Sequence, residues 1–267
     1  MTYQLGLIGG GVMGEAILSR LLQQTVYTPA QVIVSDPAAQ RRDYLAQEYQ
    51  VAVTAENGAA IAAPTILLAV KPQVFSAMAG ALPAPTYAHQ PLLLSILAGM
   101  PLARLEAGLP GCPVIRAMPN TPAIVGAGVT AIAPSQAVTP AQLDQAKAIF
   151  GAVGPVVEVA ESLMDAVTGV SGSGPAFVAL MIESLADGGV AAGLPRPVAN
   201  QLAQQTVLGT AQLIIDSGLH PGQLKDRVTS PGGTTIAGVA TLEQHGFRSA
   251  VIEAVQAAAA RSQELGQ

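Results

Sequence analysis

The stretch that decides the fold is Leu5-Gly6-Leu7-Ile8 followed directly by Gly9-Gly10-Gly11-Val12-Met13-Gly14. The four apolar residues predict a short buried strand, and the glycines match the G-x-G-x-x-G spacing of dinucleotide-binding loops. In this motif Gly9 allows a tight turn, Gly11 lets the backbone approach a pyrophosphate, and Gly14 lets the next helix pack closely on the strand. We therefore predict that a dinucleotide binds where this loop meets the N-terminus of a helix.

Residues 1–160 alternate short apolar runs with helical stretches, a pattern typical of repeated strand–helix–strand units and a parallel sheet. Strands are expected at Gln4–Ile8, Gln31–Ser35, Val51–Val53, Ile66–Val70, Leu92–Ile96, Val114–Ala117, Val129–Ala133 and Val156–Val159. Helices are expected at Met13–Gln24, Ala39–Tyr49, Asn57–Ala62, Gln73–Ala81 and Pro140–Phe150, the last with Thr139 as its N-cap. The predicted fold class is therefore α/β, with a Rossmann-type, mostly parallel sheet domain over residues 1–160.

From residue 161 the strand-like runs stop, and segments with the apolar spacing of helices take over. These segments are Ala176–Ala192, Pro197–Asp216, Thr235–Gln244 and Ser249–Leu265. The first of them is apolar almost all round, which a small domain cannot bury by itself. We therefore predict that residues 161–267 form an all-α dimerisation domain; a helix enclosed within one subunit is the alternative.

Composition narrows the function classes. The net charge of −5 and the scattered basic residues argue against nucleic acid as a partner. Two uncharged stretches, Pro72–Ala103 and Met118–Leu143, contain too many prolines for a membrane span, and the first residues do not resemble a secretory signal. A lone cysteine, Cys112, can form neither an internal disulfide nor a multi-thiolate metal site, and the three histidines have no ligand spacing. We expect no membrane, no metal and a cytoplasmic location.

The end of the second predicted strand bears on the choice of cofactor. Asp36 lies 22 positions after Gly14, where an acidic residue binds the ribose hydroxyls of NAD and repels a 2′-phosphate. Arg41 and Arg42 follow closely and, with Ser35, could hold that phosphate instead, or could simply lie on a solvated helix face. The sequence leaves NADH and NADPH open.

Other distinctive segments follow the later strands. Lys71-Pro72 follows a strand, and Ser95 to Gly99 and Met118-Pro119-Asn120 close the next two, so in a parallel sheet these segments meet the glycine loop at one crevice. Lys71 is expected to contact cofactor or substrate there, although a solvated strand end would also explain it. Asn57 either bonds the adenosine side or caps its own short helix.

Two motifs rich in small residues lie in the helical part. Val170–Ala176 opens the first long helix and is better explained by close packing than by catalysis, since no His or Lys is placed to activate its serines. Ser230–Thr235 precedes another helix, whose free N–H groups at Gly233, Thr234 and Thr235 could bind a carboxylate. A capped turn between helices is an equally good reading of this second motif.

These residues resemble the pyrroline-5-carboxylate reductase family over essentially the whole chain. The resemblance is carried by Ile8–Ile17 (IGGGVMGEAI), Ala69–Gln73 (AVKPQ), Arg116–Pro122 (RAMPNTP), Asp165–Ala176 (DAVTGVSGSGPA) and His220–Thr235 (HPGQLKDRVTSPGGTT). It implies an NAD(P)H-dependent reductase that transfers hydride to the cyclic imine 1-pyrroline-5-carboxylate, giving L-proline in the last step of proline biosynthesis. It also implies a homo-oligomer: a dimer, with a decamer as the larger assembly.

The same resemblance implies roles for individual residues. Thr235 looks like the catalytic residue that hydrogen-bonds the ring nitrogen, and Thr234 assists through its backbone. The substrate-binding set it implies is Glu161, Ser230, Gly232, Gly233, Thr234 and Thr235, with the turn of one subunit holding the substrate against the cofactor of the other. The cofactor-binding set is Gly9, Gly11, Val12, Met13, Gly14, Ser35, Asp36, Asn57, Ala69, Val70, Lys71, Pro72, Ser95, Met118, Pro119 and Asn120. Many relatives prefer NADPH, so Asp36 departs from their pattern.

Two other functions remain to be tested. A β-hydroxyacid dehydrogenase also joins a glycine-loop domain to helices, but it needs a lysine on its first interdomain helix, and Ala176–Ala192 has none. A catalytically inactive dinucleotide sensor would bind cofactor without turnover, and it would leave the Ser230–Thr235 anion site without a purpose.

Overall fold

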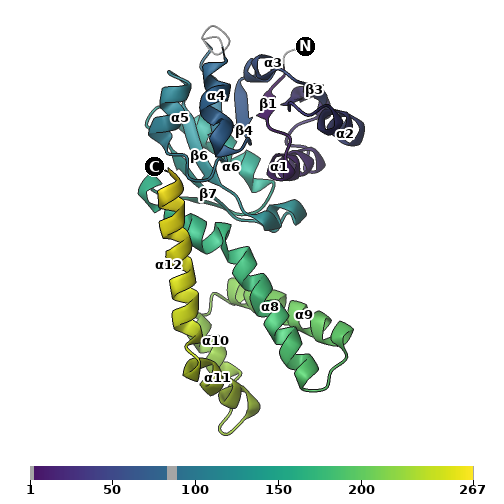
Figure 1. Cartoon of the computed structure of the whole chain (residues 1–267), viewed down its shortest axis with the longest axis vertical. Helices are drawn as coiled ribbons and strands as arrows, with labels where there is room; N and C mark the ends of the chain where they lie inside the picture. Colours follow the sequence, from purple (N-terminus) through teal and green to yellow (C-terminus); the bar gives the residue numbers. More distant parts are fainter. Residues whose placement is uncertain (1–2, 83–88, 267) are drawn as a thin grey trace. The chain divides into compact units, whose positions relative to one another are not determined.

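The computed structural model describes residues 3–82 and 89–266, which fall into two compact units. The first unit comprises Met1–Ser173 together with Ala257–Gln267, and the second comprises Gly174–Gln256. Figure 1 labels most of the helices and strands of both. The compact units divide after Ser173, and the last turns of the final helix belong to the first unit. The domain boundary expected after residue 160 stays a prediction, since compact units and functional domains need not coincide.

The first unit is built on one sheet of eight strands. The strands are β1 (Leu5–Ile8), β2 (Val32–Ser35), β3 (Ala52–Thr54), β4 (Thr65–Leu68), β5 (Leu92–Ser95), β6 (Val114–Met118), β7 (Thr130–Pro134) and β8 (Val156–Glu158). Their order is β3-β2-β1-β4-β5-β6-β7-β8, and every neighbouring pair is parallel except β6 and β7. The mostly parallel sheet is confirmed, and each strand lies within two residues of its predicted bounds.

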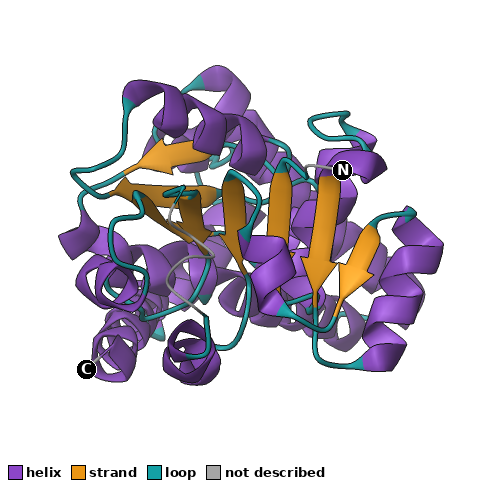
Figure 2. Ribbon diagram, turned by 90° about the horizontal axis from the view of Figure 1, so that it is seen from above, coloured by secondary structure: helices purple, strands orange, loops and turns teal. Residues whose placement is uncertain are grey.

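Helices cover both faces of this sheet, as Figure 2 shows. Side chains alternate along each strand, so Leu5 and Leu7 pack with one set of helices, whereas Ile8 packs with the other. The first set is α1 (Val12–Gln23), α2 (Ala39–Tyr49) and α6 (Pro140–Gly151), and the second is α3 (Asn57–Ile61), α4 (Phe75–Gly80) and α5 (Leu102–Gly108). Two buried faces explain why the strands are apolar along their whole length.

Short turns complete the first unit. The 3₁₀ turns are Pro29–Gln31, Pro72–Val74, Thr121–Val125 and Glu161–Leu163, followed by α7 (Met164–Val167) and a π-helical turn over Thr168–Gly172. Thr139 caps α6 as predicted, because its hydroxyl accepts a bond from the N–H of Gln142. The expected helix Gln73–Ala81 begins as a 3₁₀ turn, and α5 was not predicted.

The second unit consists of helices. They are α8 (Gly174–Ala191), α9 (Arg196–Ser217), α10 (Pro221–Arg227), α11 (Thr234–Gln244) and the first half of α12 (Phe247–Gly266). The pair α8 and α9 packs through buried Ala186, Ala199 and Ala203. These small side chains let the two helices approach closely, but they bury little apolar area.

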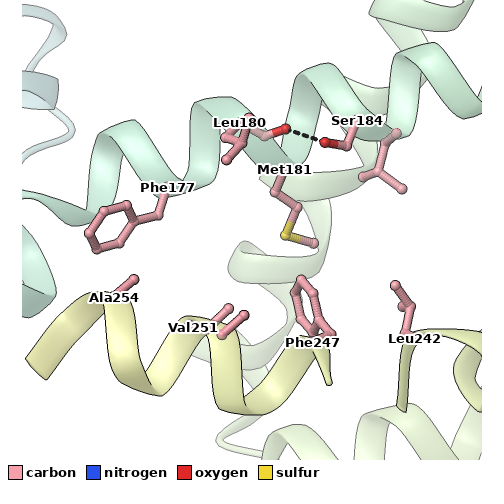
Figure 3. A pocket seen from close by; sticks show the side chains of 10 residues that line it. Phe177, Leu180, Met181, Ser184, Leu242, Phe247, Val251 and Ala254 are labelled. Carbon is pink, nitrogen blue, oxygen red and sulfur yellow. Dashed lines mark hydrogen bonds between the residues drawn. The ribbon is translucent and has the colours of Figure 1, made fainter. Parts of the chain in front are cut away.

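An apolar groove lies among α8, α11 and α12, with a volume of about 550 Å³. In Figure 3 Phe177 and Met181 of α8 lie opposite Phe247 and Val251 of α12. Leu180 in the lining is 63% exposed and Phe247 is 40% exposed. By length and composition alone the helical stretch Glu161–Ala191 is long and apolar enough to cross a membrane. One such helix is weak evidence, because the core helix of a soluble protein passes the same test. Contiguous exposed apolar side chains of this kind are typical of surfaces that bind another protein, a ligand or a membrane.

Candidate functional site

The three motif glycines of the first unit meet different surroundings. Gly9 has a φ of +102°, and a Cβ built on it would lie 2.7 Å from the carbonyl of Ala69. A Cβ on Gly14 would lie 2.4 Å from the carbonyl oxygen of Gly9, so the start of α1 packs directly on the loop. Around Gly11, in contrast, a built Cβ meets no heavy atom of the described residues within 4 Å, apart from its chain neighbours. Gly9 and Gly14 are therefore required by packing, and Gly11 leaves open space for a ligand.

The N-terminus of α1 fits a phosphate group. Gly11 is the N-cap residue, and no side chain caps the helix. The first N–H groups of an α-helix have no partner within the helix, and the helix dipole adds partial positive charge there. The open space beside Gly11 therefore adjoins a set of uncapped donors, which is the arrangement that binds a pyrophosphate.

The predicted adenosine-side residues lie together at the ends of β2 and β3. Ser35 is buried, and its hydroxyl donates to Oδ1 of Asn57 at 2.5 Å. The Asp36 carboxylate accepts two backbone bonds, from the N–H of Gly10 at 2.9 Å and from that of Ala38 at 2.9 Å. Asp36 thus joins the glycine loop to the turn after β2, a role that the sequence analysis did not foresee.

A second connection to the loop runs through Glu15 in the first turn of α1. Its carboxylate pairs with Arg41 and accepts hydroxyl bonds from Tyr44 at 3.0 Å and Tyr49 at 2.8 Å. Partial burial acts to raise the pKa of Glu15, but the bonds from Arg41 and the two tyrosines outweigh it and lower the pKa below its ordinary value. Burial and the bond to Glu15 raise the pKa of Tyr49, which keeps this hydroxyl a donor.

The lowered pKa of Glu15 predicts how Glu15→Gln will behave. An acid whose folded-state pKa lies below its unfolded value adds stability above that unfolded value and loses it as the pH falls through the folded one. We expect Glu15→Gln to cost about 1 kcal/mol or less at pH 7, as for partly exposed ion pairs, and to cost less as the pH falls below 4.5. Urea unfolding of both proteins across this pH range measures the difference, and a cost that grows toward acid would contradict the prediction.

The later predicted residues follow β4, β5 and β6. The Ala69 N–H donates to Ile8 at 2.8 Å, which holds the segment Ala69–Pro72 beside the glycine loop, and the side chain of Lys71 is exposed. Ser95 is buried at the end of β5. Oδ1 of Asn120 accepts the N–H of Val129 at 2.9 Å, so this side chain helps to shape its own loop. Because β1 and β4 are the strands between which the chain order reverses, these segments lie at the edge of the sheet where a ligand crevice is expected.

Met118 and Pro119 complete the segment after β6. Pro119 is buried, whereas Met118 is partly exposed. The Met118 methyl lies 2.7 Å from a Cβ built on Gly172, so that glycine is needed for close packing. This contact agrees with the interpretation of Val170–Ala176 as a packing motif.

A charged cluster on β6 was missed by the sequence analysis. The Arg116 side chain is only 7% exposed, with Glu161 at 3.7 Å and Asp165 at 3.9 Å. Burial lowers the pKa of Arg116, and the two carboxylates oppose that shift. Glu161 also accepts the N–H of Leu102 at 2.5 Å. A charged residue inside an otherwise apolar strand is the signal that could have revealed this cluster.

Ser262 ties the end of α12 to this cluster, and its removal should be measurable. Its buried hydroxyl donates to Oδ1 of Asp165 at 2.7 Å. We expect Ser262→Ala to lower the free energy of unfolding by about 1 kcal/mol, since it removes one hydrogen bond to a carboxylate that is a third exposed. Exposed Gln263 is the control: Gln263→Ala should leave the unfolding midpoint unchanged. Equal effects of the two changes would exclude this role.

In the second unit, the turn Ser230–Thr235 leads into α11. Gly232 has a φ of +67°, and the N–H of Gly233 donates to the Ser230 carbonyl at 3.0 Å. A Cβ built on Gly233 would overlap Oγ of Ser230, so a larger residue there would require the Ser230 hydroxyl to turn away. Gly233 is the N-cap of α11 and has no side-chain cap. The Gly233 N–H is thus used within the turn, whereas no side chain caps the N–H groups of Thr234 and Thr235; that these groups bind an anion stays a prediction.

His220 has a structural explanation as well. It is the N-cap of α10, and its Nδ1 accepts the N–H of Gly222 at 3.1 Å. The short helix that follows it was not predicted. His245 ends α11 as its C-cap.

Comparison with known proteins decides the family. The chain is 63% identical over 267 residues to a pyrroline-5-carboxylate reductase of Synechocystis, covering 100% of this chain and 99% of that protein. The chain belongs to the pyrroline-5-carboxylate reductase family. A family model described as pyrroline-5-carboxylate reductase dimerisation matches residues 161–265, and one described as NADP oxidoreductase, coenzyme F420-dependent, matches residues 4–99.

Solved structures of pyrroline-5-carboxylate reductases agree. One from Coxiella burnetii has a TM-score of 0.93 at 32% identity and covers 100% of both chains. One from Plasmodium falciparum, solved with NADP bound, has a TM-score of 0.89 at 30% identity and covers 99% of this chain and 98% of that one. The predicted family and fold class, a Rossmann-type sheet domain followed by an all-α dimerisation domain, are confirmed. The roles of single residues in the reductase site stay predictions.

Proposed function

We propose that the protein reduces 1-pyrroline-5-carboxylate to L-proline with NADPH or NADH, the final step of proline biosynthesis. The observation that carries this proposal is the 63% identity, over the full length, to a protein named for this activity. The open space at Gly11 and the uncapped N-termini of α1 and α11 support it, because a diphosphate and a carboxylate each need such donors.

The first unit is proposed to hold the cofactor. Its glycine loop would receive the pyrophosphate, and Ser35, Asp36 and Asn57 would surround the adenosine ribose. The segments after β4, β5 and β6 would line the nicotinamide end of the crevice. When bound, the reduced nicotinamide supplies the hydride. The contribution of the chain is to fix the position of the ring and to keep water away from an apolar crevice.

The second unit is proposed to hold the substrate. The N–H groups that begin α11 would bind the carboxylate of the imine, and the Thr235 hydroxyl would hydrogen-bond the ring nitrogen. A protonated imine is already electrophilic, so orientation accounts for most of the rate and no histidine base is required. The turn is proposed to act with the cofactor domain of a partner subunit. Glu161 remains a proposed pocket residue, although one of its oxygens already accepts the Leu102 N–H.

The assembly is proposed to be a homodimer, with a decamer as the larger form. The match to a dimerisation model over residues 161–265 and the exposed apolar groove of about 550 Å³ both support a second copy as the partner. A second copy would bury Leu180 and Phe247, which the second unit leaves in water. Light scattering after size exclusion gives the number of subunits. A cytoplasmic location is proposed as well, since the one cysteine is buried and free.

One assay tests the reaction. Oxidation of NADPH and of NADH is followed in parallel with pyrroline-5-carboxylate as the substrate, and we expect turnover with at least one cofactor. A 3-hydroxy acid with the oxidised cofactors serves as the comparison. Turnover only with the hydroxy acid would favour a β-hydroxyacid dehydrogenase. Tight cofactor binding without turnover of either substrate would favour a dinucleotide sensor.

A further inference from the structure

The two arginines after β2, which the sequence could not tell apart, have different surroundings. Arg41 pairs with Glu15, its Nε donates to the Gly10 carbonyl, and its guanidinium carbon lies 5.0 Å from the centre of the Tyr44 ring. Its charge is therefore already compensated by a carboxylate. Releasing it to a phosphate would leave Glu15 without its charged partner.

Gly10 is held from both sides by this part of the chain. Its N–H donates to Asp36, and its carbonyl accepts from Arg41. A Cβ built on Gly10 would lie 2.6 Å from the Leu45 side chain of α2, so the loop also packs closely on that helix. These contacts fix the middle of the glycine loop, where the pyrophosphate of any dinucleotide would lie. The contacts of Gly10 therefore do not depend on whether the ribose carries a 2′-phosphate.

Arg42 is engaged differently. Its Nη1 donates to the backbone carbonyls of Asp36 at 2.8 Å and Pro37 at 2.9 Å, which holds the guanidinium at the carboxyl end of β2. Among residues 3–82 and 89–266 no carboxylate lies within ion-pair distance of it, and its Nε and Nη2 make no hydrogen bond. A planar guanidinium with two donor nitrogens left is well suited to a phosphate.

We propose that Arg42 binds the 2′-phosphate on the adenosine ribose of NADP and so distinguishes NADP from NAD. Arg41 and Asp36 are positioning residues that hold the glycine loop in place for either cofactor. This proposal depends on the proposed function in one respect: it assumes that the bound dinucleotide is NADP or NAD. Arg42 is then the specificity-determining residue. The Asp36 carboxylate is drawn toward Gly10 and Ala38, whose N–H groups reduce its repulsion of a 2′-phosphate.

Binding measurements test this without any turnover. Titration calorimetry gives the dissociation constants of NADP⁺, NAD⁺ and 2′,5′-ADP for the wild type, Arg42→Ala and Arg41→Ala. We expect Arg42→Ala to raise the dissociation constants of NADP⁺ and 2′,5′-ADP about tenfold, because one charged hydrogen-bonding group is lost. The dissociation constant of NAD⁺ should stay within about twofold of the wild-type value. Arg41→Ala should weaken NADP⁺ and NAD⁺ by the same factor. If Arg41→Ala does not fold, Glu15→Gln replaces it and should likewise leave the ratio unchanged.

Each other result overturns the proposal. The assignment of Arg42 fails if Arg42→Ala leaves the ratio of the NADP⁺ and NAD⁺ constants unchanged, or if Arg41→Ala changes that ratio more. A wild type that binds these dinucleotides but reduces no imine would refute the proposed function alone. A wild type that binds neither dinucleotide would refute both.

Discussion

Gly14→Ala is expected to weaken dinucleotide binding by at least about a hundredfold and to destabilise the protein, because the new methyl group has no room. The built Cβ lies 2.4 Å from the Gly9 carbonyl oxygen and 3.2 Å from Cβ of Ala69. To relieve this overlap, either the start of α1 or the glycine loop must move. Both supply backbone N–H groups to the pyrophosphate, so a movement of either one disturbs the arrangement of these donors. Calorimetric titration with NADP⁺ and thermal unfolding measure the two effects.

Gly11→Ala is the matched control. Gly11 has a φ of −66° and a ψ of −175°, which alanine adopts without strain, and its built Cβ meets no atom within 4 Å. The unfolding free energy should therefore stay within about 0.5 kcal/mol of the wild type. Binding should still weaken, because the methyl group enters the space in which a pyrophosphate approaches the loop. If Gly14→Ala binds as the wild type does, or if both variants lose the same stability, the division of roles among these glycines is wrong.

Local pattern was enough to predict most of the first unit. The strands around the glycine loop are short, apolar and bounded by turn residues, and the helix Ala39–Tyr49 was predicted with its observed bounds. A buried parallel sheet makes such runs continuous, so periodicity and length identify them. The same reasoning missed α5, a helix of seven residues after Pro101. Its first N–H is held by Glu161, a contact 59 residues away in sequence that no local pattern can reveal.

Composition and spacing predicted which residues belong to the candidate site, but not which partners their side chains have. Spacing placed Asp36 at the ribose, but it could not tell that both carboxylate oxygens accept backbone N–H groups. It treated Arg41 and Arg42 as equivalent, although within the described residues only Arg41 has a carboxylate partner, Glu15, which lies 26 positions earlier in the sequence. Pairings between distant elements decide which charged groups remain available, and these depend on the packed structure.

Thr235→Ala is expected to lower kcat/KM for pyrroline-5-carboxylate roughly tenfold to a hundredfold, as for the loss of one hydrogen bond of about 1.5–3 kcal/mol in the transition state. The substitution leaves the backbone of the turn in place, since Gly233 caps α11 without help from any side chain. Alanine also has a high helix propensity, so the fold should be unaffected. Steady-state kinetics at saturating cofactor, with thermal unfolding as the check on the fold, measure the effect.

Two further substitutions distinguish the loss of the Thr235 hydroxyl from damage to the turn. Thr235→Ser keeps the hydroxyl and should retain most of the activity, whereas Thr234→Ala removes a side chain that is proposed to act only through its backbone and should cost little. Since both threonines begin the same helix, damage to the turn would affect the two alanine variants alike. A loss confined to Thr235→Ala and restored in Thr235→Ser therefore points to the hydroxyl. Unchanged kinetics in Thr235→Ala would remove Thr235 from the mechanism and leave substrate orientation to the backbone N–H groups of α11.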